Sequence, residues 1–325
     1  MLALVTGGQG FIGSHLCERL VREGHRVRVL ARPSSDLTHL EGLPVEVVRG
    51  DLIGDGPLGQ AVAGVDWVFH LAGALKGFRQ EDLLHVNRDG TRRLTEACIT
   101  HAPNLSRFVL VSTLAAAGPS PGGHISTSED VPPAPLTWYG KSKLEAEAVV
   151  LNSGLPFTIL RPPIVFGPRD RDVFSYFQIA KAGFLPVPGA KDRCYSLVYA
   201  PDLADGILHA AKVAEAASEI FNLTGSEVVT WSELGQKIST ALGVRGRVIH
   251  LPEFVLRASG RIANLAARLR GRPQIFSSQK VIEMLAPAWV ASPEKAQRML
   301  GWTARTPLDE ALALTVRWYR DHGWL

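Results

Sequence analysis

The first half of the chain alternates short apolar runs with segments in which apolar residues recur at helical spacing. Ile12, Leu16 and Leu20 repeat four residues apart after the first apolar run, and Gly24 ends that segment. We expect strands over residues 2–6, 26–31, 45–51, 66–73, 107–113 and 157–162, and helices over 83–100 and 136–150. Several of these strands are uninterrupted apolar runs, so both faces of their sheet should be covered. The pattern predicts an α/β fold with a doubly wound parallel sheet.

Glycines follow the first predicted strand. In the stretch TGGQGFIG, Gly7, Gly10 and Gly13 lie three residues apart, and Gly8, Gly10 and Gly13 satisfy the pattern G-x-G-x-x-G. Such glycines let the backbone turn tightly and approach a pyrophosphate, whose charge meets the N-terminus of the next helix. The position between a strand and a helix favours dinucleotide binding on a Rossmann-type sheet over a merely tight turn.

The end of the second predicted strand indicates which dinucleotide is bound. Ala31 and Arg32 occupy the place of the acid that binds the ribose diol, and Asp36 comes too late in the chain. Arg32, with Ser34 or Ser35, suits a 2′-phosphate. We therefore expect NADP(H) in preference to NAD(H), the alternative being that Arg32 is a solvated surface residue.

The predicted helix over residues 136–150 carries a tyrosine and a lysine four residues apart. On a helix, Tyr139 and Lys143 share one face, with Leu144, Ala148 and Leu151 as the apolar repeat. A free phenol has a pKa of about 10, which a nearby ammonium lowers, so the pair could shuttle a proton. The pattern Y-x-x-x-K is also common by chance, and taken alone it favours an ordinary helix surface.

Composition narrows the class of protein. A chain of 325 residues with 46% hydrophobic and 20% charged residues should fold into about two domains. The net charge of +4 is scattered and lacks a basic block with interleaved aromatics, so we expect no nucleic-acid partner. Cys17, Cys98 and Cys194 are odd in number and lack C-x-x-C, and the histidines show no metal spacing. We expect no disulfide, no metal, no signal peptide, no transmembrane helix and a cytoplasmic location.

Taken together, the motifs resemble the extended short-chain dehydrogenase/reductase family, the NAD(P)-dependent epimerase/dehydratase group, over nearly the whole chain. Besides the glycine turn, the matching stretches are GDL, FHLAG, VNRDGT, VSTLAAAG, YGKSK and RPPIVFGP. With Arg32 added, the resemblance implies that the cofactor is bound by Gly7, Gly10, Phe11, Ile12, Gly13, Arg32, Asp51, Leu52, Leu71, Ala72, Gly73, Tyr139, Lys143, Pro162 and Ile164.

The resemblance also implies catalytic roles for four side chains. Tyr139 would act as general acid/base on a substrate hydroxyl or carbonyl, and Lys143 would lower its pKa and hold the nicotinamide ribose. Thr113 would bind the substrate oxygen, and Asn87 would help order a proton-relay water, while hydride moves to or from the nicotinamide. A homodimer through helices around residues 83–100 and 138–152 is a further implication.

Two domains are implied as well. Residues 1–166 with 194–226 would bind NAD(P), the chain returning to the sheet through YSLVYAPDLADGI and EIFNLTG. Residues 167–193 with 227–325 would form a smaller C-terminal substrate lobe.

The substrate is indicated by departures from the nucleotide-sugar enzymes of the family. Those enzymes have Asn where this chain has Ile164, and Arg where it has Tyr195, with Arg193 two residues out of step. RPPIVFGP and LARPSS instead resemble the 3β-hydroxysteroid dehydrogenase and dihydroflavonol reductase branches, which act on apolar alcohols and ketones. We expect an oxidoreductase or epimerase acting on a small, apolar substrate, with a nucleotide-sugar epimerase as the alternative.

Residues 253–272 predict a basic amphipathic helix. One side holds Val255, Ala258, Ile262, Leu265 and Leu269, and another holds Arg257, Arg261 and Arg268. Such a helix could lie at a membrane surface or cap a lipid-like substrate. Packing of the helix on its own lobe is the interpretation that we favour.

Two other classes of function fit less well. The stretch GPSPG over residues 118–122 matches the serine-hydrolase elbow, but Pro121 lacks the N–H that the oxyanion hole needs. A non-catalytic NAD(P)-binding sensor of this family usually lacks the tyrosine or the lysine, and this chain has both Tyr139 and Lys143.

Overall fold

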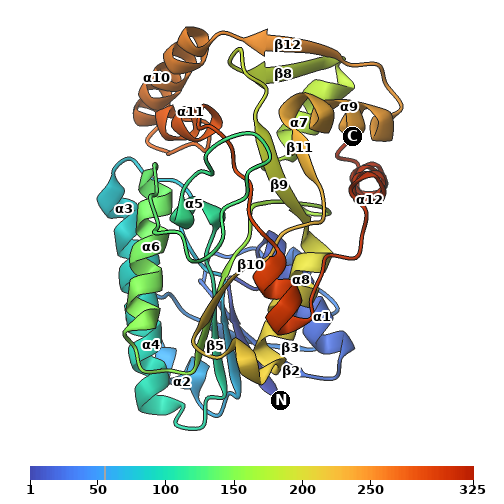
Figure 1. Cartoon of the computed structure of the whole chain (residues 1–325). Helices are drawn as coiled ribbons and strands as arrows, with labels where there is room; N and C mark the ends of the chain where they lie inside the picture. The colour runs from blue at the N-terminus through green and yellow to red at the C-terminus, as the bar shows by residue number, and fades with distance from the viewer. Residues whose placement is uncertain (55) are drawn as a thin grey trace.

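A seven-stranded sheet lies at the centre of the structure, a computed structural model that describes residues 1–54 and 56–325 (Figure 1). All its strand pairs are parallel, in the order β10-β6-β5-β4-β1-β2-β3. The strands are β1 (Leu2–Thr6), β2 (Arg26–Ala31), β3 (Val45–Arg49), β4 (Trp67–His70), β5 (Arg107–Val111), β6 (Phe157–Arg161) and β10 (Glu219–Asn222). The predicted parallel α/β sheet is confirmed.

Helices cover both faces of this sheet. Successive residues of a strand point to opposite faces, so neighbouring residues of β1 belong to two different cores. On one face, Val5 of β1 packs in a core with α1 (Phe11–Arg22) and α8 (Ala200–Lys212). On the other face, Leu4 packs in a core with α2 (Leu58–Val62), α4 (Gly90–His101) and α6 (Trp138–Leu151). A π-helical segment, His85–Asp89, joins α3 (Gln80–Leu84) to α4, so the predicted helix over 83–100 forms as one continuous run.

The rest of the chain builds two small sheets beside the main one. In the first, β9 (Cys194–Tyr199) lies between β7 (Ile164–Phe166) and β11 (Val228–Thr230). In the second, β8 (Phe184–Pro188) pairs with β12 (Arg247–Leu251). The predicted return of YSLVY to the main sheet is therefore wrong, and only EIFN of β10 adds a strand there. Pro162 and Pro163 end β6, so β7 leaves the main sheet and takes β9 as its partner. The division into two domains stays a prediction.

A second core joins these small sheets to three helices. It contains Phe177 of α7 (Phe174–Lys181), Ile238 of α9 (Trp231–Leu242) and Tyr319 of α12 (Leu308–Asp321). The remaining helices are α5 (Leu114–Ala117), α10 (Glu253–Leu269) and α11 (Ser278–Met284).

The predicted helix over 253–272 forms as α10, but its apolar side does not pack on the rest of the protein. Ile262, Leu265 and Leu269 are exposed, whereas the buried residues are Leu256, Gly260 and Ala267. A Cβ atom on Gly260 would lie 3.0 Å from Val281 Cγ2 of α11, so the glycine lets the two helices approach closely. The helix does pack on its own lobe, against α11, as the favoured interpretation expects, but it does so through its small-residue side and not through its apolar side.

The apolar repeat predicted for α6 also faces outward. Leu151 and Ala148 are exposed, and the buried side of the helix holds Lys143, Ala146, Glu147 and Val150. Glu147 is buried because it pairs with the guanidinium of Arg161. The predicted homodimer through α4 and α6 stays a prediction.

Among the residues that the structure describes, no helix is both long and apolar enough to cross a bilayer. The same residues contain no cluster of three His, Cys, Asp or Glu side chains placed to bind a metal ion. Cys17, Cys98 and Cys194 are all buried free thiols. The cytoplasmic location stays a prediction.

Candidate active site

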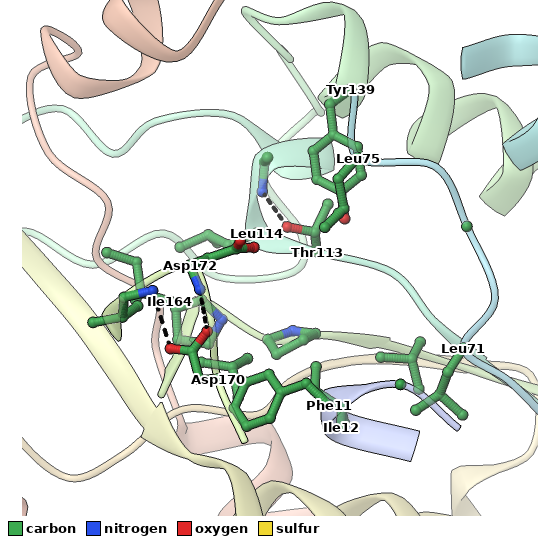
Figure 2. Close-up of a pocket in the computed structure, with 18 of the residues that line it drawn as sticks. Phe11, Ile12, Leu71, Leu75, Thr113, Leu114, Tyr139, Ile164, Asp170 and Asp172 are labelled. Atoms are coloured by element: carbon green, nitrogen blue, oxygen red, sulfur yellow. Dashed lines mark hydrogen bonds between the residues drawn. The ribbon is translucent and has the colours of Figure 1, made fainter. Parts of the chain in front are cut away.

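A cavity of about 730 Å³ runs from the glycine turn at the end of β1 to helix α11 (Figure 2). It brings together most of the side chains that the sequence singles out. The predicted residues that line it are Gly7, Gly10, Phe11, Ile12, Gly13, Leu71, Gly73, Thr113, Tyr139, Lys143, Pro162 and Ile164.

The glycine turn has the shape that a dinucleotide needs. Gly7 has a φ of 72°, and a Cβ atom there would lie 2.8 Å from the backbone nitrogen of Ala72. A Cβ on Gly13 would lie 2.1 Å from the carbonyl oxygen of Gly7, so α1 can start this close to the strand only with glycine. Gly10 is the N-cap of α1 and supplies no capping side chain. The N-terminus of α1 at the cavity therefore fits a pyrophosphate.

The turn after β2 lies at the end of the cavity that would hold the adenosine. Arg32 is exposed, and its carbonyl oxygen accepts hydrogen bonds from Ser35 N at 3.0 Å and Arg49 Nη1 at 3.0 Å. This turn folds the chain back, so Asp36 lines the cavity. Asp36 therefore reaches the cavity although it comes too late in the chain to occupy the position of the ribose-binding acid, and the preference for NADP(H) stays a prediction. Hydrogen bonds from Thr38 lower the pKa of Asp36.

Five predicted residues lie outside the cavity lining, one of them the exposed Arg32. Asp51 accepts a hydrogen bond from Ile53 N at 3.2 Å, and Leu52 is buried. The backbone nitrogen of Ala72 donates to Thr6 Oγ1 at 3.2 Å. The fifth of these residues is Asn87, which is buried.

Asn87 is buried behind the cavity wall. Its Oδ1 accepts from Ala74 N at 2.7 Å, and its Nδ2 donates to Ala74 O at 3.0 Å and Ser142 Oγ at 2.8 Å. These bonds tie the chain after β4 to α6. The geometry is that of a positioning residue, while its predicted part in a water relay stays a prediction.

The contact between α5 and α6 brings Tyr139 and Thr113 together. Thr137 Oγ1 accepts a hydrogen bond from Gly140 N at 3.1 Å and so starts α6 just before Tyr139. A Cβ on Gly140 would lie 2.3 Å from the carbonyl oxygen of Ala115, so only glycine allows the two helices to lie this close. Thr113 Oγ1 accepts a hydrogen bond from Ala115 N at 3.2 Å, and Figure 2 shows Thr113 beside the tyrosine ring.

The protonation of this pair differs from the expectation. Burial raises the pKa of Tyr139, Glu283 raises it further, and the neighbouring Thr113 hydroxyl opposes part of the shift. Lys143 Nζ donates to the carbonyl oxygen of Val111 at 2.9 Å, and burial lowers the pKa of Lys143 to about 8, against the opposing charge of Glu147. The predicted lowering of the Tyr139 pKa by Lys143 is therefore not found. At neutral pH, Tyr139 is a protonated donor beside a lysine that still carries its charge.

The cavity also holds acids that the sequence analysis missed. Asp170 is buried, and its carboxylate accepts hydrogen bonds from Asp172 N at 2.8 Å and Val173 N at 3.2 Å. Burial raises the pKa of Asp170 to about 7 and also raises that of Asp172. Figure 2 shows both acids across the view from Tyr139. The repeated acid in RDRD, directly after RPPIVFGP, was the available signal.

The wall beyond Tyr139 is mainly apolar. It is lined by Leu114, Ala115, Val173, Tyr195, Trp231, Met284 and Trp289. Of the cations that line the cavity nearby, Lys280 Nζ lies 2.6 Å from Glu283, Arg169 pairs with Glu18, and the Arg171 guanidinium lies over the ring of Trp324, 5.1 Å from its centroid. Arg193 is not part of the lining, since its Nη1 donates to the carbonyl oxygen of Pro188 at 2.6 Å. No sequence signal placed α11 over this site.

Known proteins resemble this chain over its whole length. The sequence model of the NAD dependent epimerase/dehydratase family matches residues 3–224. The chain is 30% identical over 322 residues to a ceramide reductase of Caulobacter vibrioides, covering 99% of this chain and 95% of that protein. It is 30% identical over 336 residues to a 2-alkyl-3-oxoalkanoate reductase of Stenotrophomonas maltophilia, covering 96% and 97%.

A solved structure, MoeE5 in complex with UDP-glucuronic acid and NAD, superposes with a TM-score of 0.76 at 27% identity, covering 99% of this chain and 100% of that one. Fold, cavity and relatives agree with the predicted resemblance. The chain belongs to the NAD-dependent epimerase/dehydratase family and is an enzyme of the extended short-chain dehydrogenase/reductase type.

Proposed function

We propose that this enzyme reduces a ketone to a secondary alcohol on an apolar, long-chain substrate, with NADPH as the reductant. The observation that carries the proposal is the character of the cavity beyond Tyr139, where apolar side chains are accompanied by paired cations and by the acids Asp170 and Asp172. An alkyl chain gains from this wall. A nucleotide diphosphate would meet the acids Asp170 and Asp172, and Arg171, which lies over the ring of Trp324, is the nearby lining cation that could oppose them.

The protonation of the site favours the reducing direction. A carbonyl that accepts hydride needs a proton on its oxygen, and Tyr139 holds one because its pKa is raised. Thr113 would donate to the same oxygen and stabilise its developing charge. Lys143 would place its ammonium at the ribose side of the site. The bound dinucleotide would supply the hydride.

The names of two relatives support the substrate class. One is a ceramide reductase and the other a 2-alkyl-3-oxoalkanoate reductase. Nucleotide-sugar epimerisation is the alternative, because MoeE5 binds UDP-glucuronic acid. In this chain Ile164 and Tyr195 line the cavity where that class has polar side chains.

A chain-length series tests the proposal. With NADPH, we expect kcat/KM for methyl ketones to rise about fourfold for each added methylene, because each buried methylene contributes about 0.8 kcal/mol. The rise should stop once the alkyl chain outgrows the cavity. NADPH oxidation at fixed enzyme gives the rates, with UDP-glucose and UDP-glucuronic acid as comparison substrates. Epimerisation of either UDP-sugar, or ketone rates indifferent to chain length, would contradict the proposal.

The preference for NADP(H) has its own test. Arg32 is exposed beside the cavity end, and its guanidinium would bind the 2′-phosphate, with Arg49 near by. We expect Arg32→Ala to weaken NADPH binding about 10–100-fold, the range for a hydrogen-bonded charged pair, and to leave NADH binding unchanged. Arg79→Ala, an exposed arginine elsewhere, is the matched control. An equal loss of affinity for NADPH and NADH, or no loss for either, would show that Arg32 does not bind the 2′-phosphate.

A further inference from the structure

The outer side of α10 carries an unpartnered row of large apolar side chains. Their exposed fractions are 73% for Phe254, 40% for Val255, 68% for Ile262, 61% for Leu265 and 82% for Leu269. These five residues, here called the apolar ridge, fall within roughly 100° of the helix circumference. Leu256, Gly260 and Ala267, which hold α10 on the protein, lie on the opposite side. Figure 1 shows α10 at the outer edge of the molecule.

Positive charge accompanies the ridge. Residues 253–272 contain five arginines and one acid, whereas the whole chain has 35 Lys and Arg against 31 Asp and Glu. The rest of the chain is therefore neutral, and the net charge of +4 belongs to this segment. Glu253 lies 3.8 Å from Arg257, and in the described part of the chain the other four arginines form no ion pair. Arg261 and Arg268 flank the ridge on one side and are exposed.

Hydrogen bonds join α10 to α11, and α11 to the start of α6 beside the cavity. Asn264 of α10 donates to Ser278 Oγ at 3.1 Å and accepts from Ser278 N at 3.2 Å. Gln279 of α11 accepts a hydrogen bond from Trp138 N at 2.9 Å, at the start of the helix that carries Tyr139. Ile275 and Phe276, between α10 and α11 in the chain, are exposed apolar residues as well.

We propose that α10 docks on the surface of a bilayer that contains anionic lipids, with the apolar ridge among the acyl chains and the arginines at the headgroups. An exposed apolar stripe beside basic residues is the chemistry of an interfacial helix. A second copy of the chain is a poorer partner for this face, because a two-fold contact of α10 with itself would bring the arginines of both copies together. The proposal concerns binding alone and does not depend on the substrate or cofactor.

Vesicle flotation of the full chain tests the proposal without activity. We expect the protein to float with vesicles of equal parts phosphatidylcholine and phosphatidylglycerol, and to stay unbound with phosphatidylcholine alone. Raising the salt from about 0.1 M to about 1 M should release it, since the screening length falls from about 10 Å to about 3 Å. Wild-type protein that remains unbound on the anionic vesicles would overturn the proposal.

Matched variants locate the contact. Ile262→Ser with Leu269→Ser should weaken binding at least tenfold, and Arg261→Gln with Arg268→Gln about tenfold. The controls are Ile125→Ser with Phe184→Ser and Arg79→Gln with Arg92→Gln, which change exposed residues elsewhere and should bind like wild type. Thermal unfolding verifies that each variant is folded. Ridge variants that bind like wild type would refute the assignment. A change in oligomer size without vesicles that depends on the ridge residues would also refute the assignment, because it would show that a second copy of the chain binds this face.

Discussion

Tyr139→Phe is expected to lower kcat for ketone reduction by about 10²–10⁴-fold, the contribution of a positioned proton donor. The phenylalanine keeps the ring and removes only the hydroxyl, on the side chain that lies beside Thr113 (Figure 2). Because that hydroxyl lies beside the proposed carbonyl rather than at the glycine turn, the affinity for NADPH should change little. Steady-state kinetics for kcat and fluorescence titration for NADPH affinity give the two readings.

Tyr195→Phe is the matched control for that experiment. Tyr195 lines the same cavity, but its hydroxyl donates to the carbonyl oxygen of Met284 at 3.4 Å. Its loss should leave kcat within a few-fold of wild type. Equal losses in both variants would mean that general disturbance of the cavity, not proton donation, explains the effect. Full activity of Tyr139→Phe would remove the proposed role outright.

The main sheet could be predicted because its signal is local and unambiguous. Val5, Val29 and Phe69 belong to strands that are buried on both faces. Such strands are apolar at successive positions, so each can be recognised as an uninterrupted apolar run. The glycine turn could also be predicted. The backbone of Ala72 leaves no room for a Cβ atom on Gly7, and the backbone of Gly7 leaves none for a Cβ atom on Gly13. The strand β9 was misassigned because pairing partners depend on where the chain goes after Pro163, which composition does not reveal.

Amphipathic helices expose the limit of sequence patterns. Periodicity shows that α10 and α6 have two different sides, but it does not say which side meets the protein. In α10 the small residues Gly260 and Ala267 allow close packing on α11, and the large ones stay outside. In α6 the buried side is charged, because Glu147 finds a guanidinium on β6. In both cases the partner is distant in the sequence.

In the candidate site, the sequence identified the residues but not their protonation. Thr113, Tyr139 and Lys143 were identified by their motifs, and the cavity does collect them. Their protonation could not be predicted, because it depends on tertiary burial and on Glu283 of a remote helix. A lysine four residues away suggests a lowered phenol pKa, but here burial is the largest cause of the shift in the Tyr139 pKa and raises it, while the Lys143 ammonium donates to the carbonyl of Val111.

Glu147→Ala is expected to destabilise the fold by about 3–5 kcal/mol, the loss on breaking a buried ion pair from one side. The side chains of Glu147 and Arg161 are only 1% and 2% exposed, and they are joined by two hydrogen bonds of 3.0 and 2.6 Å, to which Ser112 adds a third. Without the carboxylate, the guanidinium stays buried without its counter-charge. Urea unfolding followed by circular dichroism gives the free energy of unfolding.

Two comparisons separate the buried charge from ordinary packing loss. Glu147→Leu with Arg161→Met removes both charges and should recover much of the stability, because apolar replacements of a buried pair are often neutral. Asp309→Ala breaks an exposed pair with Lys237 and should change stability by less than about 1 kcal/mol. If the double variant is less stable than Glu147→Ala alone, the pair contributes through its hydrogen bonds and not through charge compensation. The buried side of α6, which carries Lys143, would then be held in place by polar geometry.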